Sequence, residues 1–125
     1  MDSILTIVVV TGVFLLLTSA TGNLLGKSGK PYSNMKLVFH IALFVIVTAG
    51  LVMSFLKLQE TSVNKLYSTI SLYVAGFALI INAIIGSRLK AAVEVNPKMV
   101  IAHKLATFLL TISIISTIVF LYKQM

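Results

Sequence analysis

Four long apolar stretches separated by short polar breaks constrain this 125-residue chain more than any other feature. They cover about residues 4–25, 35–56, 63–86 and 97–121. A helix needs about 20 residues to cross a hydrocarbon core of about 30 Å, and each stretch is long enough. Hydrophobic residues make up 58% of the chain and charged residues 10%, which is not the composition of a soluble domain. The sequence predicts one all-α, integral membrane domain over residues 1–125, folded as an up-down four-helix bundle.

Basic residues gather around the first and third connections between these stretches. That side holds Lys27, Lys30, Lys36, Arg88, Lys90, Lys98 and Lys104, against Lys57, Lys65 and Lys123 on the other. Lysine and arginine in short loops favour the cytoplasmic side, so we expect loops 26–34 and 87–96 in the cytoplasm and both termini outside. The net charge of +7 belongs to residues that flank apolar stretches, which indicates contact with membrane lipid and not with nucleic acid.

The chain lacks several groups on which common chemistries depend. It has no cysteine, which excludes disulfides, thiol redox chemistry and iron–sulfur ligation. Its only carboxylates, Asp2, Glu60 and Glu94, lie outside the apolar stretches, which disfavours a proton-coupled exporter. Hydrolytic and phosphate-binding motifs are missing too, so we do not expect enzymatic turnover by this chain alone. A small channel would need its polar residues along one path, and the sequence gives no sign of that alignment.

Two histidines, His40 and His103, lie inside the second and fourth stretches, which run in the same direction. At about 1.5 Å per residue, His40 lies roughly 7 Å below Met35 and His103 roughly 9 Å below Pro97, so both are expected at nearly one level. An ionisable side chain inside a membrane is costly and marks a candidate functional site. Two imidazoles from neighbouring helices can supply both axial ligands of a haem iron. We therefore predict one b-type haem between the second and fourth helices.

The residues around the histidines suit such a group. Phe44 and Thr107 follow the two histidines by one helical turn, in rows that are otherwise apolar. Haem carboxylates would point to the nearer, basic face, where the available counter-charges are Lys36, Lys98, Lys104 and Arg88. Near the same face, Asn23 and Asn82 are candidates to orient an imidazole or bind a propionate.

Other readings of these residues stay open. Each histidine, and each asparagine, can instead hydrogen-bond a neighbouring helix. A chlorophyll-type pigment needs a single imidazole and explains the pairing less well. Met99, one turn before His103, offers a sulfur ligand, although methionine in an apolar chain usually serves packing.

The two halves of the chain also look weakly alike. In each half an asparagine is followed by a glycine, a basic loop and a histidine: Asn23, Gly26 and His40, then Asn82, Gly86 and His103. Duplication of a helical hairpin would produce this order, although apolar composition makes chance similarity common.

With His40 and His103 on parallel helices, the layout of the whole chain resembles the small four-helix membrane b-type cytochromes. The resemblance implies haem b, electron transfer with a quinone or a partner redox subunit, and membership of a respiratory or photosynthetic complex. Family members with two haems supply four histidines, whereas this chain has two, so one haem near the basic face is expected. The alternative is a non-catalytic accessory membrane subunit that binds lipid or pigment at an interface.

Overall fold

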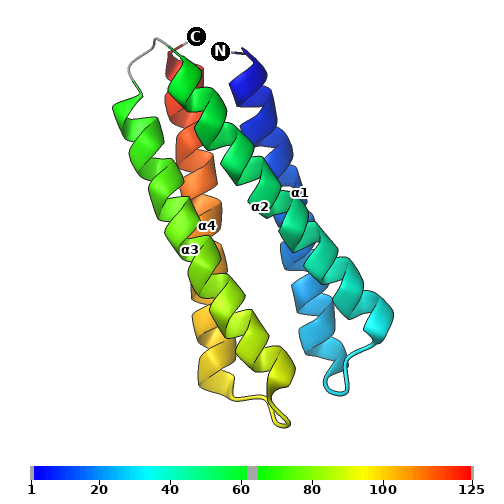
Figure 1. The fold of residues 1–125 in the computed structure, drawn as a ribbon. Helices are drawn as coiled ribbons and strands as arrows, with labels where there is room; N and C mark the ends of the chain where they lie inside the picture. Colours follow the sequence, from blue (N-terminus) through cyan, green and yellow to red (C-terminus); the bar gives the residue numbers. More distant parts are fainter. Residues whose placement is uncertain (1, 62–64, 125) are drawn as a thin grey trace.

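Four helices account for nearly all of the structure, a computed structural model that describes residues 2–61 and 65–124 (Figure 1). They are α1 (Asp2–Ser28), α2 (Asn34–Glu60), α3 (Leu66–Ala91) and α4 (Pro97–Lys123). No strand occurs in these residues, so the predicted all-α class is confirmed.

Each helix is long and apolar enough to cross a membrane, which makes the chain an integral membrane protein. With 26 or 27 residues, each helix is about 40 Å long, so its ends reach beyond the hydrocarbon core into the headgroup region. Each helix therefore continues beyond the predicted end of its span. The charged segment 87–90 forms the last turns of α3. The predicted start of the third span, Val63, lies outside the described residues.

Short connections turn the chain back at one end of the bundle. Gly29, with φ of 69°, adopts the left-handed conformation that ends α1, and its N–H donates to the carbonyl of Leu25 at 3.2 Å. At the start of α4, the side chain of Asn96 accepts from the N–H of Lys98 at 3.0 Å, with Pro97 in the first turn. These five-residue turns, 29–33 and 92–96, make α1–α2 and α3–α4 two antiparallel hairpins.

The hairpins pack together through α1 against α4 and α2 against α3, and more extensively within each hairpin. Among the described residues, α2 and α4 have no close backbone contact, and neither have α1 and α3. The expectation that the two histidine-bearing helices are neighbours is therefore wrong: they lie on a diagonal of the bundle. The physical reason is that a short turn forces each helix to pack against the one before it, which separates alternate helices.

The buried residues follow one repeating pattern in both hairpins. Five of the buried positions on α1 are 4, 8, 11, 15 and 18, and the buried positions 68, 72, 75, 79 and 82 of α3 each lie 64 residues later. Positions 43, 47, 51, 54 and 58 of α2 recur 63 residues later at 106, 110, 114, 117 and 121 of α4. Alternating steps of three and four residues place one stripe of each helix inside the bundle. The two hairpins are thus structural repeats of each other.

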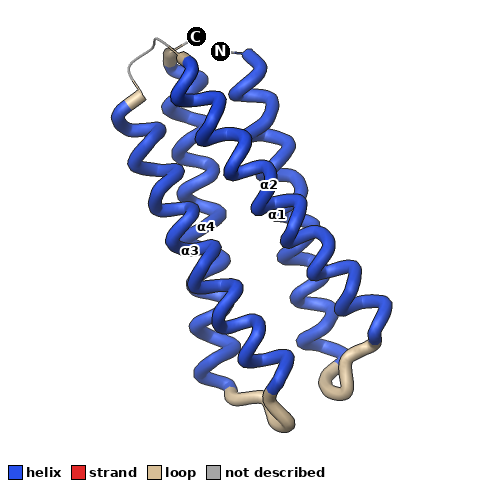
Figure 2. The backbone as a smooth tube through the Cα atoms, viewed as in Figure 1, coloured by secondary structure: helices blue, strands red, loops and turns tan. Residues whose placement is uncertain are grey.

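The contiguous apolar core occupies the end of the bundle that holds the termini. It runs from Ile4, Leu58 and Leu121 to the level of Leu15 and Leu79. Figure 2 shows the two hairpins separating from each other toward the short loops. The bundle is therefore closed at the terminal end and less tightly joined at the loop end.

Buried hydroxyl groups in this core are mostly satisfied by their own helix. Five of them donate to the carbonyl four residues earlier, at 2.7 or 2.8 Å: Thr11, Thr18, Ser54, Ser113 and Thr117. In a medium without water this local bond removes the penalty of an unpaired donor. These hydroxyls therefore form their hydrogen bonds within the helix on which they lie.

Gly50 allows α2 to pack closely against Thr11 of α1. A Cβ at position 50 would overlap Oγ1 of Thr11 and lie 3.0 Å from its Cγ2. Gly50→Ala should therefore lower the free energy of unfolding by about 1–3 kcal/mol, because overpacking forces the two helices apart. Loss of helical circular dichroism on heating in detergent micelles would measure it.

The matched control is Gly76→Ala in α3, where a Cβ would meet nothing within 4 Å. This change should be neutral or stabilising by up to about 1 kcal/mol, since alanine favours the helix. Equal destabilisation by both variants would show that close packing at Gly50 is not the cause.

Candidate histidine site

The two histidines lie at the same depth in the bundle. His40 is the seventh residue of α2 and His103 the seventh of α4, and both helices start from the loop end. Both side chains are partly buried, on the same helix faces as the core but beyond the contiguous core. The two imidazoles therefore occupy one layer at the less tightly joined end.

A glycine of the preceding helix faces each imidazole. A Cβ at Gly22 of α1 would lie 3.1 Å from Cε1 of His40, and a Cβ at Gly86 of α3 would lie 3.5 Å from Cε1 of His103. The layer thus has histidine on one diagonal pair of helices and glycine on the other. We call these four residues the histidine–glycine layer.

Thr21 is a hydrogen-bond partner of the His40 ring. Its hydroxyl oxygen lies 2.8 Å from the carbonyl oxygen of Thr18 and 2.8 Å from Nδ1 of His40. When the hydroxyl donates to the carbonyl of Thr18, its oxygen accepts from a protonated Nδ1, and Nε2 keeps its lone pair, as a metal-ligating histidine requires. When the hydroxyl turns to donate to Nδ1, the ring proton lies on Nε2.

Asn82 is the polar partner of the His103 ring, although the repeat of buried positions pairs it with Thr18 and not with Thr21. It is 5% exposed, and its amide nitrogen, when it faces the carbonyl of His103 at 3.0 Å, lies 3.1 Å from Nδ1 of the ring. In this orientation the amide donates to Nδ1. A half-turn of the amide would let its oxygen accept from a protonated Nδ1, but it would also bring that oxygen against the carbonyl oxygen of His103. The amide is therefore better satisfied as a donor to Nδ1.

The other predicted site residues fall into two groups. Thr107 belongs to the layer, because its hydroxyl donates to the carbonyl of His103 at 2.9 Å and lies 3.2 Å from the amide of Asn82. Phe44 is partly buried and packs against the core one turn from His40. Asn23, predicted as a candidate to orient an imidazole, is exposed. The polar side chain beside the His40 ring is that of Thr21.

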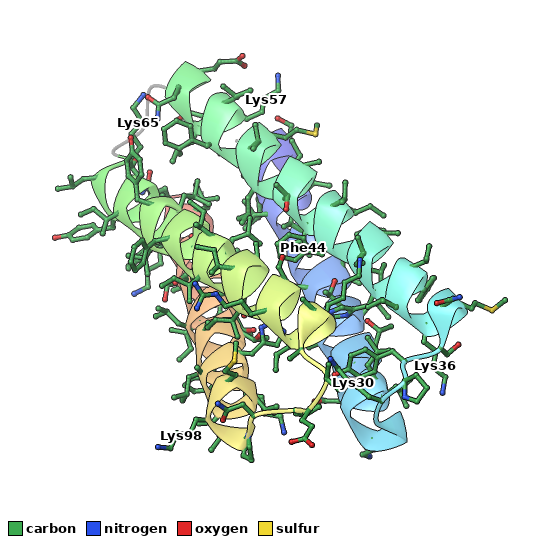
Figure 3. The ribbon with its side chains drawn as sticks, turned by 60° about the horizontal axis from the view of Figure 1, so that its bottom comes forward. Lys30, Lys36, Phe44, Lys57, Lys65 and Lys98 are labelled. Atoms are coloured by element: carbon green, nitrogen blue, oxygen red, sulfur yellow. The ribbon has the colours of Figure 1, made fainter. Side chains whose placement is uncertain are left out.

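The predicted counter-charges lie at the loop end, on the outside of the bundle. Lys36, Lys98, Lys104 and Arg88 are all exposed. In Figure 3, Lys36 and Lys98 extend from the same end of the bundle, while Lys57 and Lys65 lie at the opposite end. The basic residues therefore surround the open end of the histidine–glycine layer without contacting the imidazoles.

Sequence reasoning missed Thr21 and Gly22, and it paired Gly86 with Gly26. The repeat of buried positions instead pairs Gly86 with Gly22, 64 residues apart. One signal could have shown this pairing, because each of these helices carries two glycines ten residues apart, at 12 and 22 and at 76 and 86.

The ligand set of the layer is limited to two imidazoles. The described residues contain no group of three or more His, Cys, Asp or Glu side chains that could hold a metal ion. An iron carried in a macrocycle needs only two ligands from the protein, and this layer offers one imidazole on each of two diagonal helices. The donor set therefore fits a haem better than an ion bound by side chains alone.

Comparison with protein-family models, curated proteins and solved structures finds no match to this chain. The class defined by the fold and the site is an integral membrane four-helix bundle with a diagonal histidine pair.

Thr21→Val should remove the hydrogen bond at Nδ1 of His40, because valine has a similar shape but no oxygen. In nitrogen NMR spectra of histidine-labelled protein, the Nδ1 signal of His40 should therefore shift. Asn23→Val, two residues away and exposed, is the control and should leave the signal in place. An unchanged Nδ1 signal in Thr21→Val would contradict the contact between Thr21 and His40.

Proposed function

We propose that this chain is a membrane electron-transfer protein that binds one b-type haem between α2 and α4. The observation that carries the proposal is the histidine–glycine layer, with imidazoles on one diagonal and no side chains on the other. Nε2 of His40 and Nε2 of His103 would hold the iron. The haem would supply one-electron transfer, and the protein would supply ligation, orientation and an apolar surrounding.

Several contacts support this fit. Adjacent helices pack 8–10 Å apart, which leaves little room for a flat macrocycle, whereas a diagonal pair is separated by the full width of the bundle. Gly22 and Gly86 carry no side chain, and the imidazoles of His40 and His103 pack against them. Phe44 and Thr107 would border the macrocycle one turn deeper.

Polar partners on α1 and α3 would orient both ligands. Thr21 would accept from Nδ1 of His40, which would strengthen Nε2 as a ligand. Asn82 would accept from Nδ1 of His103 after its amide turns. At the open end, Lys36, Lys104 and Arg88 would balance the haem carboxylates.

The charge asymmetry supports an orientation with loops 29–33 and 92–96 in the cytoplasm and both termini outside. The haem would then lie near the cytoplasmic face. One haem at one level would exchange electrons with a quinone or a partner redox subunit, as part of a respiratory or photosynthetic complex. The competing proposal is an accessory subunit that binds lipid or pigment, which the exposed Tyr73, Phe77 and Phe108 on the outer helix faces favour.

The test of haem binding is the reduced-minus-oxidised absorption spectrum of protein purified with full haem supply. The intact chain should show the sharp α band of a b-type haem. His40→Ala and His103→Ala should each abolish it, because each removes an axial ligand. A colourless intact chain with normal helical circular dichroism would contradict the proposal and favour an accessory subunit.

A pair of glycine variants separates site filling from general damage. Gly86→Leu should reduce haem content at least tenfold, because its side chain would enter the histidine–glycine layer beside His103. Gly76→Leu, on the same helix and with open space around it, should retain haem. Equal haem content in the two variants would place the haem elsewhere.

The orientation can be tested with single cysteines, because the chain has none. Val93→Cys in the loop end and Gln59→Cys at the terminal end are both at exposed positions. A membrane-impermeant maleimide added to intact cells should label position 59 and not position 93. The reverse pattern would invert the proposed topology.

A further inference from the structure

A pocket lies between the two short loops at the loop end of the bundle. Its lining residues come from both hairpins: Lys30, Pro31, Tyr32, Leu37, Lys90, Ala91, Ala92 and Val93. Its volume is about 530 Å³ and it is open to the outside. We call it the seam pocket, because it follows the line where the two hairpins meet.

Lys30 links the two hairpins at this pocket. Its ammonium group donates to the carbonyl of Ala92 and, at 3.3 Å, to the carbonyl of Lys90. It also lies 5.3 Å from the ring centre of Tyr32. These carbonyls end α3, so Lys30 completes their hydrogen bonds and faces the negative end of the helix dipole. These carbonyls offset part of its positive charge, and Lys30 forms no ion pair with a carboxylate among the described residues.

The surroundings of the pocket are cationic as well. Lys90 lines it, and the one carboxylate at this end, Glu94, is not among its lining residues. The ion pair that occurs among the described residues, Lys57 with Glu60 at 3.2 Å, lies at the opposite end of the bundle. The pocket therefore combines two lysines with an apolar wall of proline, leucine, alanine and valine at the depth of lipid headgroups.

We propose that the seam pocket binds a phosphate group through Lys30 and Lys90, either that of an anionic phospholipid or a free phosphate. The apolar wall would contact the first carbons of a lipid chain, while the lysines bind the phosphate. A phosphate there would join the two loops where the hairpins separate (Figure 2). The proposal does not depend on haem binding.

The experiment is native mass spectrometry of the full chain released from nanodiscs that contain equal amounts of phosphatidylglycerol and phosphatidylcholine. The intact chain should retain phosphatidylglycerol preferentially. Lys90→Gln should lower that preference about fivefold, because one lysine near an anionic surface contributes about that factor. Lys30→Gln should lower it at least as much.

Lys65→Gln is the matched control. Lys65 also donates to a helix-ending carbonyl, that of Gln59 at 3.1 Å, but at the opposite end of the bundle. Its lipid preference should equal that of the intact chain. If Lys30→Gln does not fold, Lys90→Gln still decides the test, because Lys90 contributes its backbone carbonyl and not its side chain to the loop contacts.

Added inorganic phosphate distinguishes the two sources. Displacement of the lipid from the intact chain, with less effect on Lys90→Gln, would support a free phosphate as the ligand. A lysine-dependent lipid preference that phosphate does not change would support the phospholipid. The same preference in the intact chain, Lys30→Gln and Lys90→Gln would overturn the proposal. The result should be equal in the His40→Ala, His103→Ala double variant, which separates it from haem binding.

Discussion

The absence of water from the bilayer core is the constraint on which the rest of this structure depends. It requires each backbone N–H and C=O inside the membrane to find a partner within the chain, and four long helices meet that requirement. It acts on side chains as well. Five buried threonines and serines donate to their own helix at 2.7 or 2.8 Å. Against that background, two imidazoles at one level inside the bundle are unusual.

The two hairpins share one pattern of buried positions, and the histidine–glycine layer follows that pattern. Buried positions recur 64 residues apart in α1 and α3 and 63 apart in α2 and α4. Gly22 and Gly86 have the first spacing, and His40 and His103 have the second. The polar partners do not follow the pattern: Thr21 lies beside Nδ1 of His40, and Asn82 lies beside Nδ1 of His103. The two imidazoles therefore have equivalent positions but partners of different chemistry.

Most of the fold could be predicted from the sequence, because hydrophobic length is a strong signal for membrane helices. The depth and direction of His40 and His103 followed from counting residues. Short turns make helices that follow each other in the sequence neighbours, but the diagonal placement of α2 and α4 depends on how the two hairpins pack together, which the sequence does not show. The sequence indicates Asn23 because it is polar and lies near a helix end. Whether Asn23 or Thr21 faces His40 depends on the rotation of α1 about its axis, and that rotation follows from helix packing.

The two ends of the bundle differ in what holds them together. At the terminal end, the contiguous core includes residues of all four helices, such as Val8, Leu58, Leu72 and Leu121. At the loop end, two glycines and two partly exposed histidines replace large apolar side chains, and Lys30 provides a contact from one hairpin to the other. Helices in lipid gain little from burying apolar surface, so packing and polar contacts decide whether they associate. A ligand between the histidines and a phosphate in the seam pocket would therefore act on the same weakly joined end. Each would stabilise the closed bundle by its own binding free energy.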